Sequence, residues 1–399
     1  MAREDAVIPG REEFIALSCS LTEFSPETER VYLKESLGRV TAGDTYAVNT
    51  LPNRPASRMD GIAVRFDQVI RDQGKTEAWE LGREYVFSNT GVAVPDAYDT
   101  VILIENVSFD RQGRLRIHQL PEAKGACVQP CGKVMQKGEL LLPASTCISP
   151  SRLGLLAAGG IQQVEVLARP RVAVIPTGDE LVPFNIPLPP GKNVETNGLV
   201  LEAYLKEWGA EPVLYPIIPD DKERLFQALE QAVAQSDVVL FIAGSSKGSH
   251  DYAKAVLERA GKVYVYEVAH GPAKHTSFTL AMGKPVLGIV GPPGGAELTA
   301  EWYVKPLLCK YLRQPVPLPQ KLEVELLEEI KAHVPFDFYT RVEVTKRANG
   351  YFAKGINGFQ TSRANSCRKG NAVLHIPGGK VLIPGERALV ELRVPLEYI

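Results

Sequence analysis

The stretch "DVVLFIAG", residues 237–244, holds six consecutive apolar residues between an aspartate and a glycine. An apolar run of this length, bounded by turn residues, is typical of a strand buried on both faces of a parallel sheet. Segments with helical periodicity lie on both sides of it. The stretch therefore predicts an α/β domain in which helices cover both faces of a sheet.

The alternation of strand and helix continues in both directions from this stretch. Predicted strands lie at 171–175, 212–218, 262–269 and 285–291, and predicted helices at 197–209, 221–235, 252–261 and 296–312. Within the second helix, Leu225, Leu229 and Ala232 fall on one face, as expected when that face packs on a sheet. We therefore assign residues 171–312 to a doubly wound α/β domain.

The remaining sequence predicts two small β-rich domains and a helical N-terminal part. Short β-rich runs separated by Gly, Pro and Asp fill residues 46–144, and similar runs fill 313–399 after a proline-rich linker. Residues 1–45 and 145–170 form the predicted N-terminal helical and linker domain. Its predicted helices lie at 10–21, 26–38 and 149–160, the last two beginning with Ser-Pro pairs of the kind that start helices.

Composition narrows the class of function. Lys and Arg number 45 and Asp and Glu 47, a formal net charge of -2, which argues against a general nucleic-acid binder. The N-terminus has no signal-peptide core and no apolar run reaches membrane-spanning length, so we expect a cytoplasmic protein without a membrane partner. The six cysteines are scattered, which favours free thiols over a metal site.

Three loops follow predicted strands, at 177–180, 244–251 and 291–295. In an open α/β sheet, ligands bind beyond the carboxyl ends of the strands, and glycines allow backbone N–H groups to approach an anion. Nearby side chains add hydrogen-bond donors: Lys247, Lys274, Ser245, Ser246 and Ser249. Such loops beside carboxylates suit a phosphorylated ligand with a divalent cation. No Walker loop and no GxGxxG motif is present.

Each of these features has a plainer interpretation. Glycine-rich turns after strands occur in every α/β domain. Acidic residues could instead cap or begin the next element: Asp179, Glu180, Asp220, Asp221 and Asp251. Asp60-Gly61 could be a simple turn. The three histidines near the loops, His250, His270 and His275, are predicted to be polar loop residues rather than metal ligands.

Several motifs, in order, resemble the molybdopterin molybdenumtransferase family, which includes the E domain of gephyrin. They are "SRMDGIAV" at 57–64, "PTGDELV" at 176–182, "NVETNGL" at 193–199, "DVVLFIAG" with the later "HDY", and "VGPPGG" at 290–295. The resemblance implies a homodimer in which adenylylated molybdopterin and molybdate (or tungstate) meet in a cleft shared between the subunits. Molybdenum enters the pterin and AMP leaves with help from Mg²⁺. Possible partners are the molybdopterin adenylyltransferase and client molybdo- or tungsto-enzymes.

The resemblance also implies roles for individual residues. The catalytic set is Asp60, Asp179, Glu180 and Asp251, with Glu180 and Asp251 near the metal. The substrate-binding set is Ser57, Thr90, Gly91, Thr177, Gly178, Gly244, Ser245, Ser246, Lys247, Lys274, Pro293 and Gly294. Arg54 and Arg58 could add positive charge for molybdate.

Four loops depart from the family's pattern, at 131–134, 244–248, 272–276 and 293–296. At the first of these, Val134 stands where the family has a carboxylate. The departures favour a second hypothesis, a catalytically altered paralogue that binds a molybdopterin nucleotide as a carrier, or that serves as a scaffold for a partner enzyme. The retained carboxylates Asp60, Asp179, Glu180 and Asp251 favour the enzyme.

Overall fold

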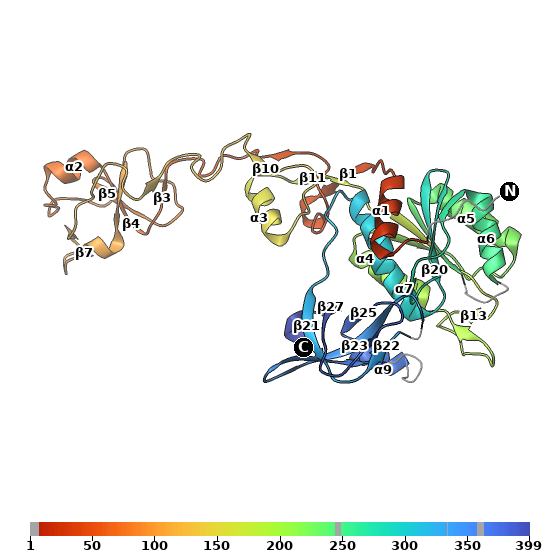
Figure 1. Cartoon of the computed structure of the whole chain (residues 1–399). Coiled ribbons are helices and arrows are strands. Elements are labelled where there is room, and N and C mark those ends of the chain that lie inside the picture. Colours follow the sequence, from red (N-terminus) through yellow and green to blue (C-terminus); the bar gives the residue numbers. More distant parts are fainter. Residues whose placement is uncertain (1–7, 244–248, 333, 357–362) are drawn as a thin grey trace. The chain divides into compact units, whose positions relative to one another are not determined.

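The computed structural model describes residues 8–243, 249–332, 334–356 and 363–399; for 249–251 and 363–365 it describes the backbone (Figure 1). The chain forms two compact units. The first comprises Met1–Glu27 and Ala168–Ile399, and the second comprises Thr28–Leu167.

The centre of the first unit is a six-stranded sheet. Its strands, in spatial order, are β15 (Glu211–Leu214), β12 (Arg171–Pro176), β16 (Val238–Ala243), β20 (Lys284–Val290), β19 (Ser277–Ala281) and β17 (Lys262–Val265). The first four are parallel. Strand β19 runs antiparallel to them, and β17 pairs antiparallel with β19, so β17 has the direction of the first four. The predicted α/β fold is confirmed, and the stretch that begins at Asp237 supplies the strand β16 near the middle of the sheet.

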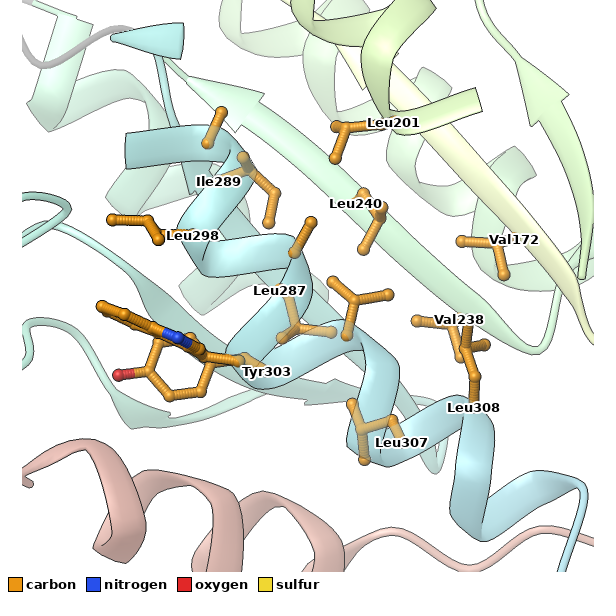
Figure 2. Close-up of a cluster of buried hydrophobic side chains, with 14 of the residues drawn as sticks. Val172, Leu201, Val238, Leu240, Leu287, Ile289, Leu298, Tyr303, Leu307 and Leu308 are labelled. Carbon is orange, nitrogen blue, oxygen red and sulfur yellow. The ribbon is translucent and has the colours of Figure 1, made fainter. Parts of the chain in front are cut away.

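Alternate residues of each central strand point to opposite faces of this sheet and build two separate cores. On one face, Val172 and Val174 pack with α1 (Arg11–Leu21), α4 (Asn197–Glu207), α7 (Pro293–Thr299), the π-helical η3 (Ala300–Val304) and α8 (Lys305–Tyr311). Figure 2 shows this core, where Leu240 and Leu287 of the sheet lie beside the helix that carries Leu307 and Leu308.

The opposite face of the sheet is covered by two other helices. Ala173 and Ile175 of β12 pack with α5 (Lys222–Gln235) and α6 (Ser249–Ala260). Asp221 accepts hydrogen bonds from the N–H groups of Glu223 and Arg224, so it is the N-cap of α5. Strand β16 consists of apolar residues because both of its faces are buried.

The first unit also contains a second six-stranded sheet built mainly from its C-terminal residues. Its strands, in order, are β18 (His270–Gly271), β23 (Asp337–Arg347), β24 (Gly350–Gly355), β21 (Lys321–Leu326), β27 (Arg387–Leu392) and β25 (Ala372–Ile376). Strand β25 also pairs with β23. The short strand β18 comes from the α/β domain and pairs in parallel with β23, so the two sheets share a main-chain connection.

Ion pairs reinforce this connection inside the first unit. Arg341 of β23 pairs with Glu297 of α7, and Arg393 pairs with Glu301 of η3. These side chains are largely shielded from water, and all four charges have a partner. Removing one partner of a shielded ion pair destabilises a protein much more than the complete pair stabilises it, because the remaining charge is left without a partner. The two pairs therefore favour one arrangement of helix and sheet.

The second unit consists of small β elements and two helices. Strand β1 (Thr28–Tyr32) pairs antiparallel with β11 (Gln163–Leu167), which is distant in sequence, beside α3 (Pro150–Ala158). Strand β2 (Thr45–Tyr46) pairs antiparallel with β10 (Leu140–Leu142). The distal part contains a three-stranded sheet of β5 (Tyr85–Ser88), β4 (Gly61–Val64) and β6 (Thr100–Leu103), the pairs β3 (Ala56–Ser57) with β9 (Val128–Gln129) and β7 (Val107–Phe109) with β8 (Leu115–Ile117), and α2 (Phe66–Arg71).

Two of the three predicted N-terminal helices are confirmed and one is wrong. Helices α1 and α3 form where the sequence predicts them, and Ser149 caps α3 by accepting from the Arg152 N–H. The helix predicted at 26–38 is absent; the described residues there form β1 and the 3-10 turn η1 (Leu33–Glu35). Strand β1 pairs with β11, more than 100 residues away in sequence, and burial of Val31 against Val164 outweighs the weak local preference for helix.

The core around β16 gives a direct prediction about stability. Leu240 is fully buried, so Leu240→Ala should lower the free energy of unfolding of the first unit by about 2–5 kcal/mol, because it leaves a cavity. Urea-induced unfolding followed by tryptophan fluorescence measures this. The control Leu318→Ala, at a position 91% exposed, should change the stability by less than about 0.5 kcal/mol. Equal effects of the two substitutions would contradict the assignment of β16 to the core.

Candidate functional site

The loop after β12 is tied directly to the end of the neighbouring strand. The N–H and Oγ1 of Thr177 both donate to the carbonyl oxygen of Ile242 in β16, at 3.1 and 2.8 Å. Gly178 has φ 137°, and a β-carbon there would lie 2.5 Å from Glu180 Oε2. Only glycine therefore fits, and the turn leaves Asp179 and Glu180 exposed beyond the carboxyl edge of the sheet.

A third carboxylate joins this pair. The Asp220 N–H donates to Asp179 Oδ1 at 3.3 Å. Burial, and then the negative charges of Asp179 and Glu180, raise the pKa of Asp220 above its usual range. Asp220, which the sequence suggested as part of a helix start, thus lies near two other negative charges. Lys192 donates to the main-chain carbonyl oxygen of Asp179 at 2.6 Å, and among the described residues its ammonium group forms no ion pair with these carboxylates.

The cluster is not a complete metal site by itself. Within the residues whose side chains are described, no three His, Cys, Asp or Glu side chains are arranged to hold a metal ion. The predicted metal ligand Asp251 lies where only the backbone is described, at the start of α6. The predicted residues Gly244, Ser245, Ser246 and Lys247 lie outside the described residues.

The loop at 291–295 is held by a side chain that the sequence analysis did not single out. Asn197, the first residue of α4 and only 7% exposed, donates from Nδ2 to the Gly291 carbonyl oxygen at 2.7 Å. A β-carbon at Gly295 would lie 2.8 Å from Val290, whereas one at Gly294 would meet nothing within 4 Å. Gly294 therefore faces open space beside Pro293. The sequence feature that could have pointed to Asn197 is a polar residue at the start of an amphipathic helix whose apolar face is buried.

The turn that carries Lys274 is coupled to the same loop through buried threonines. Thr276 Oγ1 donates to the Ala273 carbonyl oxygen at 2.8 Å and lies 3.3 Å from Thr299 Oγ1. Thr299 in turn donates to the Gly295 carbonyl oxygen at 2.8 Å. Because both threonines are fully buried, Lys274 and the start of α7 are fixed relative to each other.

The histidines divide into different roles. His270 is 2% exposed, its Nε2 hydrogen-bonds the Tyr303 hydroxyl, and its ring contacts Trp302 and Tyr339. Burial lowers the pKa of His270 to about 4, so it is neutral near pH 7. The prediction of a polar loop residue is therefore wrong for His270, because aromatic residues distant in sequence enclose it. His275 is partly exposed, and the side chain of His250 is not described.

In the second unit, four predicted residues lie together. Asp60 Oδ1 accepts the Thr90 N–H at 2.7 Å, and the Gly91 N–H donates to the Ser57 carbonyl oxygen at 2.8 Å. A β-carbon on Gly61 would lie 1.9 Å from the Ile102 carbonyl oxygen, so glycine is required there. Asp60 thus organises a turn with one oxygen, while its side chain is exposed and Oδ2 makes no hydrogen bond with the described residues.

Three other residues of the second unit that the sequence singled out, Arg54, Arg58 and Val134, are also exposed. Arg54 pairs with Asp96 at 2.5 Å, and the Arg58 N–H donates to the Cys127 carbonyl oxygen at 2.8 Å. Val134 is 59% exposed and holds its place through a backbone hydrogen bond to Leu51. The fold therefore imposes no requirement on the Val134 side chain.

The sheet order and the exposed carboxylates beyond the strand ends place this domain in the class of doubly wound α/β ligand-binding domains. Comparisons with known proteins identify its family. Residues 173–310 match the family model described as probable molybdopterin binding domain, and residues 11–160 match the MoeA N-terminal region (domain I and II). None of the described helices is long and apolar enough to span a membrane.

Individual relatives agree with these models. A molybdopterin molybdenumtransferase of Haemophilus influenzae is 30% identical over 72% of this chain and 74% of its own length. One from a Nostoc species is 32% identical over 71% and 69%. A solved molybdopterin biosynthesis MoeA protein of Pyrococcus horikoshii is 28% identical with a TM-score of 0.79, covering 98% of this chain and 100% of that one. The chain belongs to the molybdopterin molybdenumtransferase family and is an enzyme of that family.

The repulsion around Asp220 predicts a pH-dependent gain in stability. A raised pKa in the folded state means that stability is lost as the pH rises through that pKa. Asp220→Asn should therefore raise the melting temperature at pH 7, by about 1–3 °C, and the gain should shrink as the pH falls toward 3.8. Thermal scans between pH 4 and 8 measure it.

The matched control is Asp221→Asn. Asp221 caps α5, and asparagine caps helices equally well, so the melting temperature should stay close to that of the wild type. A fall in melting temperature for Asp220→Asn at pH 7 would show that Asp220 is stabilising rather than repelled.

Proposed function

We propose that this protein inserts molybdenum, supplied as molybdate or tungstate, into adenylylated molybdopterin with release of AMP, as a step of molybdenum-cofactor biosynthesis. The observation that carries the proposal is that residues 177–180 and the 291–295 loop both follow the carboxyl ends of parallel strands in one sheet. This edge therefore offers the exposed carboxylates of Asp179 and Glu180 and a helix start, groups that suit a phosphoanhydride with a cation.

In this proposal the carboxylates serve the cation. Glu180 and Asp251 would hold Mg²⁺ through carboxylate oxygen atoms, with Asp179 as a further catalytic carboxylate, and the ion would supply charge neutralisation at the phosphoanhydride. The raised pKa of Asp220 supports the choice, because it follows from burial and from the negative charges of Asp179 and Glu180, an excess of negative charge that a nearby cation would offset. Each of these residues has a carboxylate oxygen suited to a hard divalent ion.

Other residues of the first unit bind the nucleotide and pterin in this proposal. In this proposal Ser245, Ser246 and Lys247, with Gly244, donate to phosphate oxygens. Thr177 and Gly178 shape the neighbouring turn, because their N–H groups already donate to the carbonyl oxygens of Ile242 and Ile218. Pro293-Gly294 leaves open space at the start of a helix whose dipole favours negative charge. Lys274 supplies a positive charge for an oxyanion.

The second unit contributes Asp60, Ser57, Thr90 and Gly91 in this proposal. We infer a homodimer in which these residues complete the cleft of the partner subunit. The support is chemical: an exposed carboxylate with an oxygen that makes no hydrogen bond with the described residues, on a turn held by Thr90 and Gly91. The adenylyltransferase that makes the substrate and the molybdo- or tungsto-enzymes that accept the product are the expected partners.

A second candidate function is favoured by one observation. Val134 is exposed and apolar at a position where the family has a carboxylate, and neighbouring site loops also differ. A protein that lost the reaction but kept the pterin pocket would act as a carrier or scaffold for a partner enzyme.

One assay separates these functions. Purified protein is mixed with adenylylated molybdopterin, Mg²⁺ and molybdate, and AMP is quantified by chromatography. Molybdate-dependent AMP release supports the enzyme. Tight binding of the pterin nucleotide without release supports the carrier, and absence of binding contradicts both.

Asp60→Asn tests the proposed catalytic carboxylate. The amide oxygen of asparagine can still accept the Thr90 N–H, so the melting temperature should change little, whereas loss of the charge should slow AMP release at least about 100-fold. The control Glu77→Gln removes an exposed charge from the same unit, away from the proposed site residues, and should leave the rate unchanged. Full activity of Asp60→Asn would show that Asp60 only shapes the turn.

A further inference from the structure

The turn that carries Lys274 contains its own negative charge. Glu267 Oε2 lies 3.3 Å from Lys274 Nζ, and Glu267 Oε1 lies 3.1 Å from His275 Nδ1. One carboxylate therefore sits between two basic side chains at the place where the proposed function puts an anionic ligand. The sequence analysis did not single out Glu267.

The main chain fixes this contact. The Val268 N–H donates to the Lys274 carbonyl oxygen at 2.8 Å, so Glu267 and Lys274 are held opposite each other across the turn. The Ala269 N–H donates to the Pro9 carbonyl oxygen at 2.9 Å, which anchors the same segment to the N-terminal residues. Part of the entropy cost of the ion pair is therefore met by the fold of the turn.

The C-terminal β domain forms the other boundary of the lysine side chain. Lys274 Nζ lies 5.6 Å from the centroid of the Phe336 ring, within the range of a cation–π contact. A β-carbon at Gly271 would lie 2.7 Å from Phe338, so the turn is pressed against this domain. The side chain of Lys274 is 42% exposed, so an incoming anion can reach it while Glu267 and Phe336 are in place.

We propose that Glu267 is a built-in counterion of Lys274 that an anionic ligand must displace, and that it thereby lowers the affinity of this turn for anions. The proposal rests on the proposed role of Lys274 in binding an oxyanion. A carboxylate and a tetrahedral oxyanion compete for the same ammonium donors and repel each other, so Glu267 weakens binding of any small anion. The same penalty applies to every anion that Lys274 holds, so free phosphate or sulfate binds weakly, whereas a pterin nucleotide offsets the penalty through its further contacts.

The test uses tungstate and AMP as separate probes, titrated by calorimetry into the whole protein with Mg²⁺ present. Glu267→Gln keeps the size of the side chain and removes its charge. It should tighten binding of the anion that Lys274 holds by about two- to fivefold, the range expected for a partly exposed ion pair. Tighter binding of tungstate assigns the turn to the metal oxyanion, and tighter binding of AMP assigns it to the nucleotide phosphate.

Two further variants make each outcome decisive. Lys274→Met should lower the affinity for the same anion at least about tenfold, because the substitution removes a charge-assisted hydrogen bond. Glu323→Gln, which removes a charge from the exposed pair with Arg387, should leave both affinities unchanged and so controls for net charge. A matching Tm for all variants shows that the fold is retained.

The two proposals fail in distinguishable ways. Unchanged or weaker binding of both probes by Glu267→Gln, together with a loss in Lys274→Met, overturns the counterion role and leaves the anion-binding role of Lys274 standing. Wild-type affinities in Lys274→Met, or no binding of either probe to any variant, overturn the role of Lys274 itself and the inference with it.

Discussion

Burial of β16 on both faces is the constraint on which the site depends. An apolar strand such as Val238–Ala243 is stable only inside a sheet covered by helices on both sides, and parallel neighbours require a helical crossover between successive strands. The carboxyl ends of β12, β16 and β20 therefore meet at one edge. This packing brings loops that are far apart in sequence to the same edge of the sheet. The hydrogen bonds from Thr177 to Ile242 form because β12 and β16 are adjacent and parallel.

The C-terminal β domain is part of this arrangement because it reaches the loops through the backbone and through charge. Strand β18 pairs with β23, and Glu297 and Glu301 of the helix that begins at the 291–295 loop pair with Arg341 and Arg393. These contacts fix the helix from its far side, as Asn197 fixes the loop from its near side. Precise positioning of backbone donors needs such support, because small displacements at a site cost much more in rate than in stability.

Local signals in the sequence predicted the features that depend on local physics. Helix starts at Ser149 and Asp221 were visible because a cap is a contact between residues three or fewer positions apart. Strand β1 was not predicted, since its partner β11 is supplied by a distant segment. For the same reason the burial of His270 among Tyr303 and Tyr339, and the contact of Asp220 with Asp179, could not be read from spacing. The resemblance supplied the candidate residues, but not the contacts that hold them.

Structural demand separates the residues of the candidate site into two kinds. Gly178 is favoured by its positive φ, and Gly61 and Gly295 by the close approach of neighbouring atoms, so the fold alone explains them. The carboxylates of Asp179 and Glu180 and one oxygen of Asp60 are exposed, and the charge of Asp179 acts against burial of Asp220. Residues that the fold does not need, and that cost it stability, are the ones that a function must explain. Val134 is the converse: its side chain is exposed and under no structural demand, so the fold alone does not explain which residue stands there.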